Sequence, residues 1–282
     1  ALLWESTATK SNKLLKVSLE NVPHKPRGTS WITYLRCHDD IGLGYEDEHA
    51  RWAGYDAHTH RRFITDYLTG KIDWSVSKGF PFMEDPVRGD ARISGSLASL
   101  AGLEKALESS DHGKVTMAVS RIQMLHAIIL SYGGIPMLYM GDELGMLNDY
   151  SYLDNEAKRD DNRWVHRPAM NWDKAELRNV EGTIEASLFQ FIKKLIAVRK
   201  GLEVLADENN TYLINTGNDR VLAFGRYQES DKIICVFNLN DQEEWFSLDV
   251  IRREGIDTAQ GLLDLSSDMI VDQPYDQIRL TP

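Results

Sequence analysis

The residues best suited to chemistry stand at the end of a short apolar run, in the stretch "WITYLRCHDDIG" that covers residues 31–42. The run over 31–37 has the residue types of a packed β-strand. His38, Asp39 and Asp40 follow directly, before a glycine that lets the chain turn. An imidazole and two carboxylates are groups that carry out acid–base and charge-stabilising steps. The stretch therefore predicts a polar functional site at the exit of this strand.

A second stretch, "GGIPMLYMGDELG" at 133–145, repeats this pattern of an apolar strand followed by carboxylates, here Asp142 and Glu143. Strands that alternate with helices and end in acidic residues are typical of a (β/α)8 barrel, whose active site lies at the C-terminal strand ends. Only two such strands can be counted, and two units cannot close a barrel. Two alternatives remain open, a smaller α/β fold or the back end of a larger barrel.

The predicted helices and loops around the two strands must hold the strand exits in position. Apolar residues at spacings of three and four predict helices at 2–20, 114–131 and 187–202. Residues 41–110 are rich in Gly, Pro and Ser towards their end and predict an ordered excursion. The long polar loop at 146–184 is of a length that usually serves a function. Short β-rich runs with turn signals fill 207–282 and predict a separate small β-sandwich, which leaves 1–206 as the strand–helix domain.

Composition excludes several classes of protein. The 282 residues are 42% hydrophobic and 27% charged, which is typical of a globular protein large enough for one large domain and one small one. The net charge of −11 disfavours a nucleic-acid partner, which calls for a basic face. No uninterrupted apolar run approaches the roughly 20 residues of a membrane helix, so no membrane partner is expected.

Cys37 and Cys235 lie too far apart in sequence to indicate a disulfide framework, and we expect buried, reduced thiols. The first twenty residues lack the basic start and apolar core of a signal peptide, which favours a cytoplasmic location. The chain opens on Ala1 inside a predicted helix, and this start is interpreted as a cut, with the true N-terminus outside the chain.

Taken together, these motifs resemble the amylosucrase and sucrose hydrolase branch of glycoside hydrolase family thirteen, the α-amylase clan. "RCHDDIG" resembles the seventh-strand motif of the clan, and "GGIPMLYMGDELG" resembles the eighth strand and its exit. "YDAHTHRRF" and "GFPFMEDPVRGDARISGS" are similar to the excursion that amylosucrases insert after the seventh strand. The resemblance runs over nearly the whole chain and implies the last two units of a (β/α)8 barrel, followed by a C-terminal β-sandwich.

The resemblance implies a reaction and roles for the residues in it. Amylosucrase cleaves sucrose with retention, through a covalent glucosyl-enzyme that is passed to a glucan or to water. Asp39 matches the third carboxylate of the clan, which binds the glucose 2- and 3-hydroxyls and stabilises the positive charge of the transition state. His38 matches the imidazole that binds the same hydroxyls, and Asp40 matches a residue on the fructose side.

Three arginines are carried over as substrate-binding residues. Arg163, in "DDNRWVHRP", matches the arginine that walls off the glucose pocket by pairing with an acid from the N-terminal half. That acid is missing here, so Arg163 is expected to be unpaired. Arg61 and Arg92 match arginines that bind sucrose or the growing glucan further out. No metal and no cofactor are expected.

The catalytic pair is not found in the chain. The resembled enzymes carry a nucleophile Asp and an acid/base Glu at the exits of strands four and five, and the opening helix here matches the region after both. A retaining pair needs two carboxyl groups about 5 Å apart, and Asp142 and Glu143 match structural or rim positions. The chain alone is therefore expected to be inactive and to associate with its missing half or with itself through exposed apolar surface.

The sequence thus predicts the C-terminal part of an amylosucrase-like glucosyltransferase that acts on sucrose and α-glucan or maltooligosaccharide. Alternatives within the clan are a sucrose hydrolase, a trehalose synthase or a plain amylase. Leu43 and Gly44 depart from the bulkier residues of the resembled family, which leaves hydrolysis and polymer transfer both open. An alternative of another class is a carbohydrate-binding protein without catalytic activity.

Overall fold

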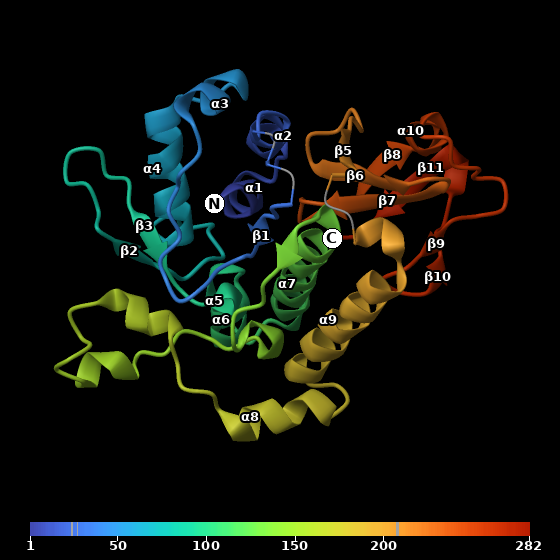
Figure 1. Cartoon of the computed structure of the whole chain (residues 1–282). Coiled ribbons are helices and arrows are strands. Elements are labelled where there is room, and N and C mark those ends of the chain that lie inside the picture. The colour runs from blue at the N-terminus through green and yellow to red at the C-terminus, as the bar shows by residue number, and fades with distance from the viewer. Residues whose placement is uncertain (24, 27, 207–208) are drawn as a thin grey trace.

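The computed structural model describes residues 1–23, 25–26, 28–206 and 209–282. Its first part, ahead of the β-rich region, is built mostly from helices around two short parallel strands (Figure 1). The elements of this part are α1 (Leu2–Thr9), α2 (Lys13–Glu20), β1 (Ile32–Thr33), α3 (Asp47–Trp52), α4 (Ala57–Leu68), β2 (Phe80–Phe82), β3 (Arg92–Ser94), α5 (Leu97–Leu100), α6 (Leu103–Glu108), α7 (His112–Tyr132), β4 (Ile135–Pro136), α8 (Trp172–Glu176) and α9 (Ile184–Gly201).

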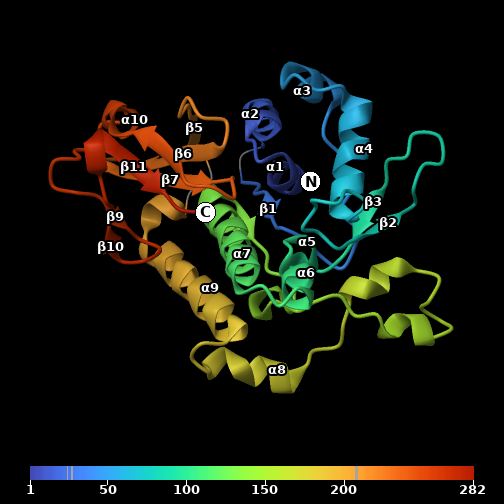
Figure 2. The ribbon, with the colours of Figure 1, turned by 180° about the vertical axis from the view of Figure 1, so that it is seen from behind.

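The two predicted strand exits lie side by side, because β1 and β4 pair in parallel with Ile32 opposite Ile135. The pair lies between α1 and α7 in both views (Figure 1, Figure 2). The prediction of a packed strand over 31–37 was wrong in length and in burial. The strand spans Ile32–Thr33, and the side chains of Trp31, Ile32 and Tyr34 are exposed. Within the described residues β1 and β4 form a sheet of two strands, so neither outer edge has a neighbouring strand to cover it.

Gly134 makes the close approach of the two strands possible. Its φ is +72°, and a Cβ atom there would lie 2.5 Å from the backbone oxygen of Trp31. That oxygen accepts the hydrogen bond from the Ile135 N–H at 2.8 Å. A side chain at 134 must therefore separate the strands.

We expect Gly134→Ala to lower the free energy of unfolding by about 2–4 kcal/mol, because it adds backbone strain and disrupts the hydrogen bond between the strands. Gly217→Ala is the matched control: its φ is also +72°, but nothing lies within 4 Å of the added Cβ. The control is expected to lose about 1 kcal/mol. Urea unfolding of both variants measures the difference. Equal losses would show that the strand contact contributes nothing.

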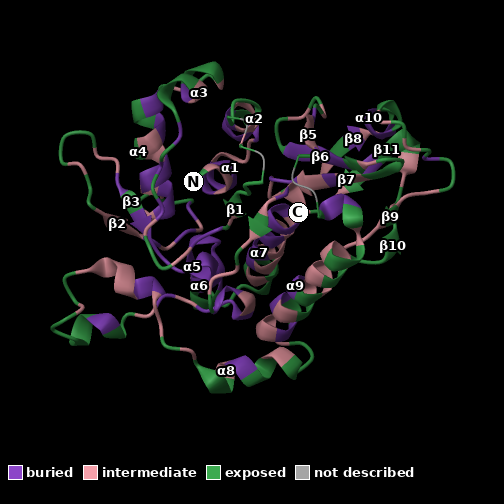
Figure 3. Cartoon of the chain, viewed as in Figure 1, coloured by how far each residue is buried: buried purple, intermediate pink, exposed green. Residues whose placement is uncertain are grey.

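The helices form one hydrophobic core, to which α1, α4, α5, α7 and α9 all contribute (Figure 3). The predicted helix over 114–131 is confirmed within α7, whose N-cap Asp111 accepts a hydrogen bond from the Lys114 N–H at 3.2 Å. His126 is buried, as expected for a packed histidine, and its Nδ1 bonds to the carbonyl of Ile122 at 2.8 Å. Burial lowers the pKa of His126 to about 4.

By length and composition alone, α7 could cross a membrane. It packs instead against α6 and α9 in this structure and buries Arg121 among its apolar residues. Core helices of globular proteins commonly meet the same criteria of length and composition. The absence of a membrane partner stays a prediction.

The excursion after β1 carries α3, α4, the antiparallel hairpin of β2 and β3, and the short helices α5 and α6. It is anchored to α1 by a buried contact between Glu5 and His60, whose Oε1 and Nε2 atoms lie 2.9 Å apart. It is also anchored to the exit of β1, because Ile41 and Ile93 exchange two backbone hydrogen bonds. The excursion is therefore an ordered part of the first domain.

The rest of the chain is mostly β-structure and packs beside α7 and α9 (Figure 1). An antiparallel sheet in the order β5-β6-β7 and an antiparallel pair β8–β11 contribute to one core with α10. The bounds of these elements are β5 (Thr211–Ile214), β6 (Val221–Gln228), β7 (Asp231–Asn238), β8 (Glu244–Ser247), α10 (Leu248–Arg253), β9 (Leu263–Asp264), β10 (Met269–Ile270) and β11 (Gln277–Leu280). Residues 207 and 208, where the second domain is predicted to begin, lie outside the described residues, and the boundary stays a prediction.

Candidate active site

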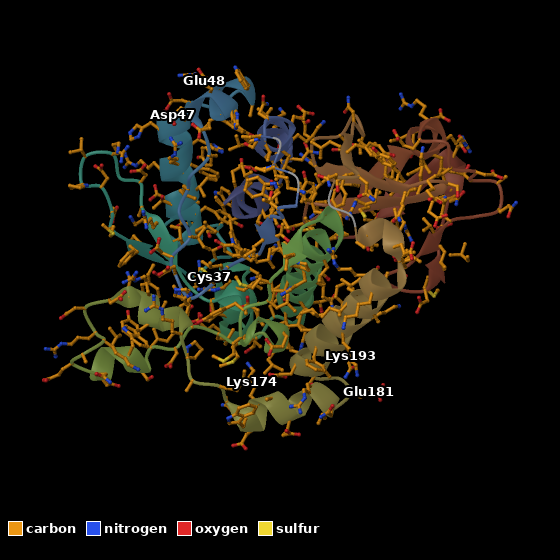
Figure 4. All side chains as sticks on the ribbon, viewed as in Figure 1. Cys37, Asp47, Glu48, Lys174, Glu181 and Lys193 are labelled. Atoms are coloured by element: carbon orange, nitrogen blue, oxygen red, sulfur yellow. The ribbon has the colours of Figure 1, made fainter. Side chains whose placement is uncertain are left out.

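The predicted functional residues lie a few positions after the end of β1, and their backbone passes between the excursion and the long loop after β4. Figure 4 labels Cys37 at this position. Both thiols are free; Cys235 is buried as expected, whereas Cys37 is only half-buried, so the expectation of burial was wrong for Cys37. The indole N–H of Trp4 donates to the carbonyl of Leu35 at 2.9 Å, which fastens the start of the exit to α1.

Asp39 lies at the centre of a group of polar side chains. Its side chain is 51% exposed. Its Oδ1 lies 3.3 Å from Nη1 of Arg163 and 3.5 Å from Nη2 of Arg167. Its Oδ2 lies 3.5 Å from Nε2 of His38. A carboxylate held in this way, next to an exposed imidazole, can accept hydrogen bonds from a sugar and stabilise nearby positive charge.

Arg163 was expected to be unpaired, and the structure corrects this expectation. Its Nε and Nη2 each lie 2.9 Å from a carboxylate oxygen of Asp161, and its guanidinium group stacks on the ring of Phe82 at 4.6 Å. The expectation failed because a neighbour two positions away supplies the acid. Asp161 also accepts the Arg163 N–H at 3.0 Å, and Arg163 in turn lowers the pKa of the Asp161 carboxyl.

Asp40 points away from solvent, and its side chain is only 4% exposed. Arg92, the first residue of β3, reaches Asp40 Oδ2 with its Nη1 at 3.3 Å. The structure thus brings two predicted substrate-binding residues together, across the contact between Ile41 and Ile93. Their binding of substrate stays a prediction.

Arg61 has a different set of partners. Its guanidinium group bonds to the carbonyls of Leu43 and Tyr45, at 3.2 and 2.5 Å, and to the carboxylate of Asp47 at 2.6 Å. It also lies over the ring of Tyr45 at 4.6 Å. In this structure Arg61 holds the turn that leads into α3, and its binding of substrate stays a prediction.

Sequence reasoning missed His166 and Arg167. Both contact the carbonyl of His38: the Nε2 of His166 lies 3.0 Å from it, and the Nε of Arg167 lies 2.6 Å from it. Both residues belong to the segment "DDNRWVHRP", in which Arg163 is the residue predicted to bind substrate. The contact is to a backbone atom, and no pattern of residue types marks such a contact.

Asp142, at the exit of β4, is buried, whereas its neighbour Glu143 bonds to the Gly141 N–H at 2.8 Å. Burial raises the pKa of the Asp142 carboxyl to about 8, although the buried guanidinium of Arg36 acts in the opposite direction. Arg36 donates to the carbonyl of Cys37, and its Nε and Nη1 have no hydrogen-bond partner among the described residues. These groups lie beneath the site.

We expect Asp142→Asn to flatten the dependence of stability on pH. Between about pH 4 and pH 8 the unfolded chain has lost this proton and the folded chain keeps it, so stability falls as the pH rises, by at most about 1.4 kcal/mol per pH unit. The variant removes this contribution. Urea unfolding at pH 5, 6, 7 and 8 is the measurement, with the exposed Asp173→Asn as the control that keeps the slope. A variant slope equal to that of the unmodified chain would contradict a protonated, buried Asp142.

Among the described residues, no group of three or more His, Cys, Asp or Glu side chains is placed to hold a metal ion. The side chains at the strand exits are those that bind polar, hydroxyl-rich ligands: carboxylates, an imidazole and guanidinium forks. The aromatic rings of Phe82 and Trp164 add apolar faces beside them, through their contacts with Arg163 and Arg167. The arrangement fits a carbohydrate.

Comparison with known proteins gives relatives that act on sugars. The chain is 22% identical over 262 residues to a trehalose synthase of Thermus thermophilus, covering 86% of this chain and 23% of that protein. It is 29% identical over 211 residues to a glucosylglycerate phosphorylase of Escherichia coli, covering 73% and 34% respectively. It is 31% identical over 126 residues to a cyclomaltodextrinase of Thermoanaerobacter pseudethanolicus, covering 45% and 18%. No family profile matches the chain.

Among solved structures, the chain is similar to a sucrose 6F-phosphate phosphorylase from Thermoanaerobacter thermosaccharolyticum, with a TM-score of 0.57 and 16% identity. The match covers 84% of this chain and 42% of that enzyme. The chain therefore spans less than half the length of each of these proteins. The trehalose synthase, the cyclomaltodextrinase and the glucosylglycerate phosphorylase are thus similar to this chain in sequence, and the solved phosphorylase structure is similar to it in fold.

Proposed function

We propose that this chain is the C-terminal part of an amylosucrase-like enzyme of the α-amylase clan, which transfers glucose from sucrose. The observation that carries the proposal is the convergence of Asp39, His38 and Arg163 at the exit of β1, beside the parallel strand β4. The doubled Asp motif and the excursion favour the amylosucrase branch. Membership of the α-amylase clan is the coarser part of the proposal, it is supported by the relatives, and it does not depend on this branch.

In the proposed reaction, a carboxylate outside this chain attacks the anomeric carbon of the glucosyl unit. The bond to the fructose oxygen breaks, and an acid outside this chain gives that oxygen its proton. Asp39 stabilises the positive charge that develops on the glucosyl ring, and His38 binds its hydroxyls. Arg163 borders the glucose pocket and orients Asp39 through their 3.3 Å contact. A glucan hydroxyl or water then takes the glucosyl group.

The partner that we propose for β1 and β4 is the remainder of a (β/α)8 barrel. Two strands cannot close a barrel. Ile32 and Ile135 are paired residues of the two strands. They are 60% and 58% exposed, so the strands present an apolar surface that further strands of a barrel would cover. The relatives are more than twice as long as the chain, which supports a larger complete protein.

The experiment is to incubate the complete protein with sucrose, with and without maltooligosaccharide, and to follow fructose, glucose and glucan. Fructose release with glucan growth supports the proposal. Fructose and glucose in equal amounts without glucan support a sucrose hydrolase. No action on sucrose, combined with action on maltose or starch, overturns the amylosucrase branch and leaves a trehalose synthase or an amylase.

Phosphorolysis is a second candidate, because one relative and the similar solved structure are phosphorylases. It predicts that sucrose or a related glucoside is cleaved only when inorganic phosphate is present, with glucose 1-phosphate as the product. The same assay with and without phosphate separates the two candidates.

A binding protein without catalytic activity is the alternative of another class. It predicts sugar binding by the 282-residue chain and no turnover in the complete protein.

Arg92 is expected to serve the acceptor side of the site. We expect Arg92→Ala to lower glucan yield by about tenfold and fructose release by less, because a lost charge-assisted contact costs about 1.5 kcal/mol on the acceptor alone. Arg88→Ala is the control, since Arg88 lies on the same hairpin and pairs with Asp85 at 2.9 Å. Both products are measured in one reaction with sucrose and maltooligosaccharide. Equal losses of both products would place Arg92 at the sucrose-cleaving step instead.

A further inference from the structure

His166 is a buried histidine that the proposed mechanism does not use. It is 1% exposed. The amide N–H of Gly95 donates to its Nδ1 at 3.0 Å, and its Nε2 lies 3.0 Å from the carbonyl oxygen of His38. An amide nitrogen can only donate and a carbonyl can only accept. The two contacts therefore require the neutral tautomer that carries its proton on Nε2.

The surroundings of His166 keep it neutral. Burial lowers its pKa to about 3, and the cationic side chains of Arg36 and Arg167 act in the same direction. The hydrogen bond to His38 and the carboxylate of Asp161 act in the opposite direction and are outweighed. A second proton on the ring would also have to face the Gly95 N–H, which is itself a donor.

Three segments that are distant in sequence meet at this ring: β3 through Gly95, the exit of β1 through His38, and the long loop through His166 itself. Each pair of segments is also joined elsewhere. Ile41 bonds to Ile93, the Ser94 hydroxyl lies 2.9 Å from the side-chain oxygen of Asn162, and Arg163 contacts Asp39. The ring of His166 contacts both other segments at once.

We propose that His166 is a positioning residue: by holding the His38 carbonyl between β3 and the long loop, it sets the direction in which the His38 and Asp39 side chains face the sugar. This inference rests on the proposed function. Without the Nε2 contact, the Arg167 bond at 2.6 Å remains on the same carbonyl, but the connection from this carbonyl through the ring to Gly95 is lost. A displacement of about 1 Å in a reacting site can lower the rate on the order of 100-fold.

The geometry is tested first on the 282-residue chain by long-range ¹H–¹⁵N NMR of its histidine rings. The expected result is a neutral His166 with its proton on Nε2 between pH 5 and pH 8. The His38 ring and Asp39 amide signals are expected to shift in His166→Phe and to stay in place in His126→Phe, a matched change at a buried histidine whose Nδ1 bonds to Ile122 within α7. A proton on Nδ1, a charged ring at pH 6, or unmoved His38 and Asp39 signals in His166→Phe would overturn the proposal.

The consequence is tested on the complete protein with three variants. His166→Gln can still donate to the His38 carbonyl, His166→Asn can still accept from Gly95, and His166→Phe can do neither. We expect His166→Gln to stay within about threefold of the unmodified kcat, and the other two to lose on the order of 10- to 100-fold in kcat with KM little changed. Loss of kcat in all three in proportion to their loss of stability would show a merely structural role and overturn the proposal.

The two tests separate failure of this inference from failure of the proposed function. A complete protein that cleaves no glucoside contradicts the function, while the NMR experiment still decides whether His166 positions His38 and Asp39. An active complete protein in which His166→Phe keeps full kcat contradicts the positioning role alone. His126→Phe serves in both tests as the variant that changes a buried ring away from the site.

Discussion

Asp39→Asn in the complete protein lowers kcat on the order of 10²- to 10³-fold or more, if Asp39 stabilises the charge of the transition state as proposed. The amide keeps the shape of the side chain but removes the negative charge that faces the developing cation. Because this interaction strengthens only in the transition state, kcat and kcat/KM are expected to fall together. Initial rates of fructose release over a range of sucrose concentrations measure both quantities.

The fold is expected to survive this change. Asp39 is half exposed and contacts two arginines that have other partners, so the free energy of unfolding is expected to change by less than about 1 kcal/mol. Asp160→Asn is the matched control, an exposed carboxylate in the neighbouring loop, and it is expected to keep full activity. An Asp39→Asn variant with activity within threefold of the unmodified enzyme would remove Asp39 from the mechanism.

The 282-residue chain on its own is expected to associate through the surface around β1 and β4. Ile32 and Ile135 are opposite one another on this surface, and Trp31, Tyr34 and Met140 are exposed nearby in the sequence. Burying the exposed part of two isoleucine side chains contributes about 3 kcal/mol, so Ile32→Lys together with Ile135→Lys is expected to weaken association on the order of 100-fold. Sedimentation velocity over a range of concentrations measures the effect.

The control is a chain with two lysines at exposed apolar positions elsewhere. The two substitutions are Val87→Lys, between β2 and β3, and Tyr275→Lys, in the β-rich part of the chain. The residues they replace are 91% and 95% exposed. This variant has the same added charge and is expected to associate like the unmodified chain. A monomeric unmodified chain, or equal weakening by both pairs of lysines, would contradict a specific surface at the two strands.

The sequence predicted the parts of the fold whose cause is local. The spacing of apolar residues over 114–131 predicts a helix because side chains three and four apart share one face, and α7 contains that helix. The two strand exits were placed at one site from the rule for parallel strands, and the pairing of Ile32 with Ile135 agrees with that rule. The rule predicts which residues lie near one another, but it does not predict which of their atoms are in contact.

The features that the sequence did not predict depend on contacts that join distant parts of the chain or that follow no periodic pattern. Trp31 and Ile32 have the residue types of a buried strand, yet burial requires covering elements, which the described residues do not supply. Arg163 was expected to be unpaired because an ion pair between residues two apart in a loop follows no periodic pattern. The sequence does not predict the contact of His166 with the His38 carbonyl, because residue types carry no information on which backbone carbonyls accept hydrogen bonds.

The central claim is that this chain supplies the stabilising carboxylate of a glucosyl-transferring site whose nucleophile and acid/base lie outside it. The most direct measurement is fructose release from sucrose by the purified 282-residue chain beside the complete protein, with the intact mass of both samples checked. We expect release by the complete protein and none by the chain. Release by the chain at an enzyme-like rate would contradict it, and the nucleophile would then have to be sought among the carboxylates of this chain.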